Sequence, residues 1–314
     1  MSERLLTSSD STIQREFLLL AFVRYAEFQP LLFWGVLLMY LLTVLGNMTI
    51  ILLVCQESSL HTPMYFFLCN LATQDIVYVS AIQPKLLSIT LTGATSIGFP
   101  YCIIQMFLFV MCTDTDFFLL TSMAYDRYVA ICISLRYSLI MNRIICTRLA
   151  VSCWLFAALN SFMYCWLVSG LSYCRSRAIK HFFCEVKAVL KLSCSDTSTI
   201  NMILYIEGAL GGLLPFLLIL TSYIFIILTI VNMRSSVGRL KAFSSCSTHL
   251  TVVILFCGTV ISLYMKPDTE YSEEQDKVLS LLYVAVVPML NPIVYSMRNK
   301  EVLKSLKKHF ANNI

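Results

Sequence analysis

The sequence predicts an all-α membrane protein whose core is a bundle of seven transmembrane helices. The 314 residues are 58% hydrophobic and only 13% charged, with a mean hydropathy of +0.76, whereas a soluble domain carries about a quarter charged residues. Seven apolar windows reach the length of about 20 residues that a helix needs to cross a hydrocarbon core about 30 Å thick. No run alternates polar and apolar residues as barrel strands do. The spans are therefore helices, which satisfy their own backbone hydrogen bonds in lipid.

The seven windows differ in the acids that they contain. Four hold no Asp, Glu, Lys or Arg, the second and fifth hold Asp75 and Glu207, and the third holds Asp114 and Asp116. An ionisable side chain at membrane depth is costly, so these acids are candidate functional residues. In chain order the windows are Phe28–Cys55, Leu60–Pro84, Leu86–Tyr125, Leu149–Cys174, Thr197–Met233, Ala242–Met265 and Val278–Met297.

An odd number of spans places the two termini on opposite sides of the membrane. We divide the chain into an N-terminal segment (1–27), a membrane domain (28–297) and a C-terminal tail (298–314). With the N-terminus outside, the inner segments carry 12 Lys and Arg residues and the outer segments 11, which does not decide the orientation by the positive-inside rule. The bases of the tail follow the last span closely, as at an anionic cytoplasmic leaflet. We therefore expect an extracellular N-terminus.

Four of the 13 cysteines gather on the side of the membrane expected to face outward. Cys174, Cys184 and Cys194 lie in or beside the one long loop, and Cys102 lies in the third window, in its outer half. An even group in an oxidising compartment indicates two disulfides. We expect Cys102–Cys184 and Cys174–Cys194, with the loop lying over the bundle as a lid. The sequence leaves free thiols and the other two pairings open.

Several other classes of protein lack support in the sequence. The four histidines have no ligand spacing for zinc, and we find no nucleotide-binding loop, no nucleophile–base constellation and no nucleic-acid patch. We therefore expect neither an enzyme nor a nucleic-acid-binding protein, and no cofactor. A transporter or channel is the rival class. It would show internal repeats with paired broken helices or a series of pore charges, and neither is present.

Six segments of the chain, in a fixed order, are similar to those of one known family. The most specific is MAYDRYVAIC, at Met123–Cys132. The other five are Gly46–Asn47, Leu60–Asp75, Ser222–Tyr223, Lys241–Leu250 and Pro288–Val302. Together they resemble the olfactory (odorant) receptors among the rhodopsin-like G-protein-coupled receptors, and the resemblance extends over about residues 17–308, nearly the whole chain.

The resemblance implies a function at the plasma membrane. Such a receptor binds a small volatile ligand within the bundle and activates a heterotrimeric G protein of the stimulatory, olfactory class, which raises cyclic AMP. Asp126 would restrain Arg127 at rest, and residues 298–310 would form a short amphipathic helix on the membrane. The residues implied in coupling and activation are Asp126, Arg127, Tyr128, Tyr223, Lys241, Ser245, His249, Asn291, Pro292 and Tyr295.

The resemblance also implies a ligand cavity among the third, fifth, sixth and seventh helices. A mostly apolar cavity with few polar groups suits a small volatile molecule. The two acids there leave alternatives open: they bind an amine, as in a non-olfactory receptor of the same class, or each forms a hydrogen bond to a neighbouring helix. Alignment gives the lining residues as Phe109, Val110, Thr113, Asp114, Glu207, Gly211, Val260, Ile261, Tyr264 and Leu281.

A sodium site is the third implication of the resemblance. In the family, acids at the positions of Asp75 and Asp116 surround a cation together with Asn291, and oxygen ligands suit such a hard ion. The alternative is a pair of protonated or water-bridged carboxyls. Asp114, two residues from Asp116, points nearly the opposite way on a helix and would not join this site.

The chain departs from the family pattern in four respects. Ile133 and Ser134 stand where the family usually has His-Pro, which bears on G-protein coupling, and Cys257 replaces the usual Tyr near the cavity floor. The shorter Asp116 stands where Glu is common. No glycosylation sequon precedes the first span, which bears on surface expression rather than on the fold.

Overall fold

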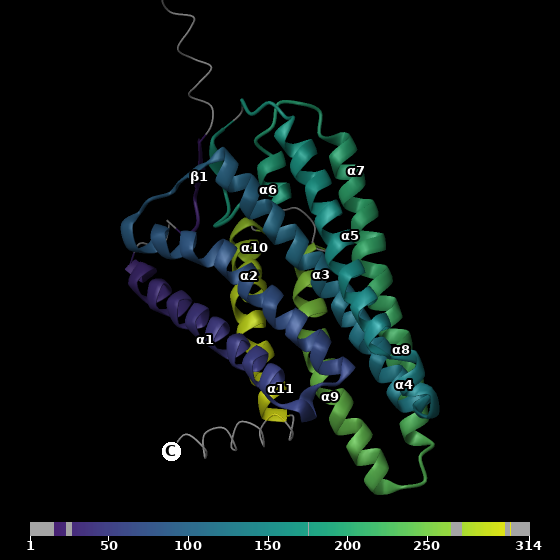
Figure 1. Cartoon of the computed structure of the whole chain (residues 1–314). Coiled ribbons are helices and arrows are strands. Elements are labelled where there is room, and N and C mark those ends of the chain that lie inside the picture. Colours follow the sequence, from purple (N-terminus) through teal and green to yellow (C-terminus); the bar gives the residue numbers. More distant parts are fainter. Residues whose placement is uncertain (1–15, 23–26, 175, 265–271, 299–301, 303–314) are drawn as a thin grey trace, which may run out of the picture.

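The computed structural model describes residues 16–22, 27–174, 176–264, 272–298 and 302. Within these residues, seven helical segments are long and apolar enough to cross a membrane. The predicted fold class, a seven-helix membrane bundle, is therefore confirmed (Figure 1). The expected amphipathic helix at residues 298–310 lies outside the described part of the chain, apart from Arg298 and Val302.

The first four spans are unbroken helices, and the fifth and seventh each contain a short π-helical segment. The spans are α1 (Gln29–Gln56), α2 (Pro63–Thr92), α3 (Phe99–Cys132), α5 (Arg143–Ser169), the fifth built from α7 (Ser198–Glu207), η4 (Gly208–Leu213) and α8 (Leu214–Val231), α9 (Ser236–Tyr264), and the seventh built from α10 (Ser272–Leu281), η5 (Leu282–Val286) and α11 (Val287–Arg298). Shorter helical turns are η2 (Ser58–Leu60), η3 (Ser134–Arg136), α4 (Tyr137–Ile140) and α6 (Val186–Leu190).

The border between the second and third spans differs from the sequence prediction. Pro84, expected at the end of a span, lies inside α2, which continues to Thr92. A transmembrane helix tolerates an internal proline because neighbouring groups satisfy the freed backbone. The helix stops at Gly93, whose φ of 70° closes it in the left-handed conformation that glycine adopts without strain. The third span consequently begins at Phe99, well after the expected Leu86.

Three short strands form a sheet that the sequence analysis did not predict. The strands are β1 (Glu16–Leu19), β2 (Ser96–Gly98) and β3 (Ala178–Ile179), in the order β2-β1-β3. β1 runs antiparallel to β2 and parallel to β3. Phe17 and Leu19 are buried while Leu18 is exposed, the alternation of a strand with one covered face. The N-terminal segment is thus joined to two loops at one end of the bundle, which we call the disulfide end.

Helix α3 lies at the centre of the bundle and packs against α2, α5, α8 and α9. Helix α1 packs against α2 and α11. The approach to α11 is close, because a Cβ added at Gly46 would lie 2.9 Å from Cγ of Pro292. The outer faces of the bundle are apolar: Leu31 and Trp34 on α1 and Trp166 on α5 are all more than 60% exposed. Such a surface fits lipid as the surrounding solvent.

Candidate functional site

Both expected disulfides are present at the disulfide end. Cys102 of α3 joins Cys184 in the long loop, with the two Cα atoms 5.4 Å apart, and Cys174 joins Cys194 within that loop at 5.8 Å. The backbone amide of Cys184 also donates a 2.9 Å hydrogen bond to Oε1 of Gln105 on α3. The loop is therefore fastened to the central helix.

A series of contacting aromatic rings connects this loop to the interior of the bundle. Phe22, just after β1, stacks on Phe182 with the ring centroids 5.8 Å apart. Phe182 contacts Phe183 at 5.0 Å, and Phe183 contacts Phe109 of α3 at 4.7 Å. His181 stacks on Phe182 at 4.8 Å. The loop therefore packs against α3 at Phe109, which is one of the expected ligand-binding residues.

Below the loop, this series of ring contacts continues between α2, α3 and the seventh span. Phe109 contacts Tyr78 at 5.8 Å and Tyr283 at 6.5 Å, and the Tyr283 hydroxyl donates to Oγ1 of Thr113 at 2.9 Å. Tyr283 also contacts Phe256 at 5.7 Å. Tyr283 therefore links Phe109 to Thr113, and Tyr78 packs against Phe109 and Tyr283. The sequence analysis named neither tyrosine. An aromatic residue within an apolar span gives no sign of which face it occupies.

The other expected cavity residues lie on α3, η4, α9 and α10. Val110 and Val260 are buried in the core, and Leu281 packs against it half-buried. Gly211 lies inside η4, where only Cγ of Glu207 would approach an added Cβ within 4 Å. The backbone of Ile261 and Tyr264 belongs to α9, but their side chains lie outside the described part of the structure.

Asp114 and Glu207 meet across three helices. The Asn160 side-chain amide on α5 donates to Oδ2 of Asp114 on α3 at 2.8 Å and also to Oε1 of Glu207 on α7. The two carboxyls therefore share the Asn160 amide group as donor, and Tyr164 of α5 lies beside Glu207. Both acids therefore accept a hydrogen bond from a neighbouring helix, which was one of the two alternatives stated for them. The sequence analysis named neither Asn160 nor Tyr164.

A second acidic pair lies deeper, between α2, α3 and α11. Asn291 donates to Oδ2 of Asp75 at 2.9 Å, and Gln74 donates to Oδ2 of Asp116 at 3.1 Å. Both acids are buried and act on each other electrostatically. Asn47 of α1 lies beside Asp75. The three residues expected around a sodium ion are therefore close together, and Gln74 is an addition to them.

The oxygen-rich surroundings of this pair fit a hard cation. Oε1 of Gln74 is buried and has no hydrogen-bond partner among the described residues, so an acceptor oxygen is available beside the carboxylates. Within the same residues, no group of three or more His, Cys, Asp or Glu side chains could hold a metal. Any ion here would depend on amide oxygens and water as well as on the two acids.

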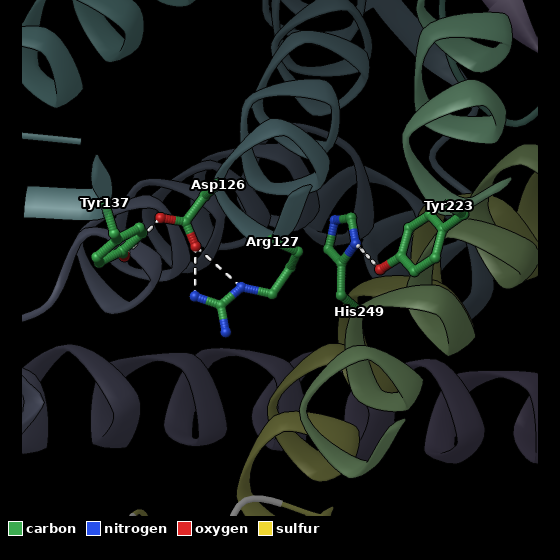
Figure 2. Close-up of polar contacts among 5 residues, drawn as sticks. All are labelled: Asp126, Arg127, Tyr137, Tyr223 and His249. Carbon is green, nitrogen blue, oxygen red and sulfur yellow. Dashed lines mark hydrogen bonds and ion pairs between the residues drawn. The ribbon is translucent and has the colours of Figure 1, made fainter. Parts of the chain in front are cut away.

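At the opposite end, which we call the Arg127 end, Asp126 has both oxygens engaged (Figure 2). Arg127 forms an ion pair with Oδ2, its Nε atom lying 2.9 Å away. The Tyr137 hydroxyl in α4 donates to Oδ1 at 2.8 Å. Burial and the neighbouring Asp126 carboxylate raise the pKa of Tyr137, so the phenol stays protonated and donates. Tyr137 follows the unusual residues Ile133 and Ser134, and the sequence analysis gave it no role.

Next to this ion pair, a hydrogen bond joins the fifth and sixth spans (Figure 2). The Tyr223 hydroxyl on α8 lies 2.6 Å from Nδ1 of His249 on α9, and the two rings stack. Tyr295 on α11 is fully buried, with a hydroxyl that has no hydrogen-bond partner in the described part of the chain. Tyr128 packs its ring against Phe225 of α8.

For two of the remaining expected coupling residues, the structure describes the backbone alone. The backbone of Lys241 and Ser245 belongs to α9, but their side chains lie outside the described residues. Pro292 lies inside α11, where it forms the close contact with Gly46.

Comparison with known proteins identifies the family. The sequence profile of the family described as "Olfactory receptor" matches residues 36–313. This chain belongs to the olfactory receptor family. It is 42% identical over 300 residues to olfactory receptor 2T5 of Homo sapiens, covering 96% of this chain and 95% of that protein. It is also 46% identical over 293 residues to human olfactory receptor 1F1 (93% and 94%) and 43% identical over 306 residues to olfactory receptor 1E16 of Mus musculus (98% of each).

As an olfactory receptor, the protein is a multi-pass membrane G-protein-coupled receptor for odorants and not an enzyme. The receptor therefore contains two acidic pairs, Asp114 with Glu207 and Asp75 with Asp116, as well as the two ends of α3 described above. A transporter, a channel and a membrane enzyme are no longer alternatives.

Proposed function

We propose that this olfactory receptor binds a small volatile molecule beneath the disulfide-bonded loop and activates a G protein of the stimulatory, olfactory class, which raises cyclic AMP. The observation that carries the proposal is the arrangement around Asp126. Its carboxylate holds Arg127 on one side and accepts from Tyr137 on the other. An arginine held in this way at the end of the central helix is unavailable to a partner until the ion pair breaks.

Activation then follows from a difference in ligand affinity. A ligand shifts the equilibrium toward the active bundle only by as much as it binds that state more tightly. Contacts at Phe109, Thr113 and their tyrosine neighbours bias the seventh and sixth spans, because Tyr283 touches both Thr113 and Phe256 of α9. Movement of α9 breaks the Tyr223–His249 hydrogen bond and exposes Arg127.

In this proposal the disulfide end faces outward at the plasma membrane and the Arg127 end faces the cytoplasm. The N-terminal segment 1–27 is then extracellular, residues 28–297 form the receptor domain, and residues 298–314 form a cytoplasmic tail. Two disulfides at one end support this orientation, because disulfides persist in an oxidising compartment.

An allosteric sodium ion at Asp75, Asp116 and Asn291 stabilises the resting state in this scheme. The buried carboxylates support it, and so does Oε1 of Gln74, which has no hydrogen-bond partner in the described part of the chain. We expect NaCl to raise the melting temperature of the purified receptor relative to choline chloride, and we expect Asp75→Asn to abolish that difference. An equal effect of both salts on the native receptor would contradict the sodium site.

The function is tested in cells with a cyclic-AMP reporter and surface labelling of the N-terminus. We expect some volatiles to raise cyclic AMP, and we expect Asp126→Asn to raise the basal signal because it weakens the hold on Arg127. Tyr137→Phe should raise it less, since one buried acceptor loses a hydrogen bond worth about 1–3 kcal/mol.

Tyr125→Phe serves as the control for these variants, because Tyr125 is an exposed tyrosine of the same helix end. Well-expressed Asp126→Asn receptor with an unchanged basal signal would contradict the role given to the ion pair. A native receptor that reaches the surface but responds to no volatile would contradict the proposed function.

A further inference from the structure

We propose that a groove between α2 and α5 binds an anionic phospholipid of the phosphatidylserine type, with an acyl chain in the groove and the headgroup at Arg143 and Arg148. The inference rests on the proposed function in one respect: the Arg127 end faces the cytoplasm, whose leaflet carries the anionic lipids. The groove lies between the second and fourth spans. It is therefore separate from the ligand cavity, which is expected among the third, fifth, sixth and seventh spans.

The first observation is a hollow on the lipid-facing surface of the bundle. Helices α2 and α5 pack against each other, and the groove between them has a volume of about 410 Å³. Val151 and Leu155 in its wall are 58% and 55% exposed, so an occupant enters from the bilayer. An unfilled groove forfeits dispersion contacts, and a flexible acyl chain can fill it. The walls include Phe66, Asn70, Thr147, Val151, Trp154 and Leu155.

A hydrogen bond joins the two walls and fixes the shape of the groove. Nε1 of Trp154 on α5 donates to Oδ1 of Asn70 on α2 at 3.1 Å, and Nδ2 of Asn70 donates to the backbone oxygen of Phe66 at 2.9 Å. The indole N–H is therefore satisfied within the protein, and the rest of the ring is an apolar wall. Because these side chains are already ordered, binding of a lipid chain costs little further conformational entropy in the protein.

The second observation is positive charge at the Arg127 end of the groove. Arg143, the first residue of α5, precedes Thr147 by four residues and Val151 by eight, so the three lie on one face of the helix. Arg148 flanks the same face. Both arginines are exposed, and among the described residues neither forms an ion pair. None of the described residues that line the groove is acidic, so an anionic headgroup would meet two positive charges at this end.

A sterol and a second copy of the chain fit these observations less well. A sterol carries no net charge, so it would leave both arginines without a counter-ion. A symmetric dimer through this face would bring Arg143 and Arg148 of one copy toward those of the other, and like charges oppose association. An anionic phospholipid supplies both an acyl chain for the groove and the opposite charge at its end. The observations therefore favour the phospholipid.

The test uses the 3 tryptophans of the chain, because bromine atoms on an acyl chain quench the fluorescence of an adjacent indole ring. Trp34→Phe with Trp166→Phe leaves Trp154 as the fluorophore of the purified full-length receptor. The receptor is placed in phosphatidylcholine nanodiscs with increasing fractions of brominated phosphatidylserine or brominated phosphatidylcholine. We expect phosphatidylserine to reach half-maximal quenching at a mole fraction at least about fivefold lower, the ratio that corresponds to about 1 kcal/mol for one arginine near an anionic lipid.

Trp166 measures the background contact with lipid. It lies on the same helix, toward the disulfide end, and is 72% exposed, but it does not line the groove. Trp34→Phe with Trp154→Phe leaves Trp166 as the fluorophore, and the two brominated phospholipids should quench it equally.

Variants of the arginines make the result specific. Arg143→Gln with Arg148→Gln should remove the preference for phosphatidylserine at Trp154 and leave quenching by phosphatidylcholine unchanged. Arg234→Gln with Arg239→Gln is the matched control, because it removes two charges from exposed residues at the same end of the bundle that do not line the groove. It should keep the preference. Val151→Phe fills the groove and should reduce the quenching of Trp154 by both phospholipids.

The outcomes separate this inference from the proposed function, because fluorescence quenching involves neither an odorant nor a G protein. Equal quenching of Trp154 by the two phospholipids, or a preference that survives loss of Arg143 and Arg148, overturns the site. So does unchanged quenching in Val151→Phe, or stronger quenching by a brominated sterol than by brominated phosphatidylserine, which would assign the groove to a sterol. A preference for phosphatidylserine in a receptor that responds to no volatile supports the site and contradicts the proposed function.

Discussion

His181 shows how one residue of the covering loop depends on its surroundings. Its side chain is buried between two phenylalanine rings, and Nε2 lies 3.2 Å from Oγ of Ser280 on α10. Burial and then the nearby Lys277 ammonium lower the pKa of His181 to about 3. Glu185, with Oε2 4.0 Å from Nε2, does not outweigh them. The imidazole is therefore neutral at physiological pH.

The lowered pKa predicts that acid destabilises the receptor. In the unfolded chain His181 has its ordinary pKa of 6.5. Below that pH the unfolded chain binds a proton that the folded receptor does not bind until about pH 3. The free energy of unfolding therefore falls as the pH falls from 6.5 toward 3, by up to about 1.4 kcal/mol per pH unit from this residue. Above pH 6.5 the residue contributes no pH dependence.

Thermal unfolding of the purified receptor between pH 7.5 and 5 checks this prediction. His181→Gln should flatten the profile, because glutamine keeps a polar side chain that does not titrate. An identical pH profile in both proteins would show that other groups are responsible.

At the scale of elements, close packing of helices depends on single small residues. Helices α1 and α11 meet where Gly46 faces Pro292. Small residues at such contacts allow transmembrane backbones to approach closely. The π-helical segments η4 and η5 are a second feature of this scale: each lies inside a span, and η4 follows Glu207 directly. A π segment changes which residues face the bundle, and such segments are frequent at functional sites.

Gly46→Ala should destabilise the receptor by about 1–3 kcal/mol, because the added methyl group would lie 2.9 Å from the Pro292 ring and force the helices apart. The measurement is thermal unfolding in detergent. Gly35→Ala on the same helix is the control, since a Cβ there meets no atom within 4 Å. The idea fails if both variants unfold at the same temperature.

At the scale of the whole molecule, segments far apart in sequence meet at the disulfide end. Strand β1 joins β2, which precedes α3, and β3, which lies in the long loop. Phe17 of β1 packs against Phe99 and Tyr173, with ring centroids 5.9 and 5.3 Å apart. Residues 16–22 are therefore part of the cover over the bundle.

Phe17→Ala should lower the stability of this cover by about 3 kcal/mol, the cost of truncating a buried phenylalanine. We expect a lower melting temperature and faster dissociation of any bound volatile. Leu18→Ala serves as the control, because Leu18 lies on the exposed face of the same strand. Equal behaviour of the two variants would mean that the strand does not hold the cover in place.

Much of this molecule could be predicted from the sequence because lipid imposes simple rules. Apolar windows of sufficient length must be helices, so all seven spans were expected and are present. The disulfides were predicted because the four cysteines gather at one end. The resemblance of Met123–Cys132 to the receptor family implied that Asp126 restrains Arg127, and the structure pairs the two side chains.

The partners of these residues could not be predicted in the same way. Tyr137, Asn160 and Gln74 are polar residues of ordinary kinds, and nothing in their spacing indicates which helix they face. The strand β1 is four residues long and gains its pairing only from two distant loops. The π-helical segments interrupt the fifth and seventh spans at places that no local pattern specifies.

The sequence by itself determined that this chain crosses the membrane seven times, because the cost of burying polar backbone and charge in lipid limits each segment to one kind of structure. Its motifs, through their resemblance to a known family, indicated a receptor. Only the tertiary structure decided which acid meets which amide, tyrosine or arginine. Those contacts depend on helix rotation and distance, and these are set by packing between segments that are far apart in the chain.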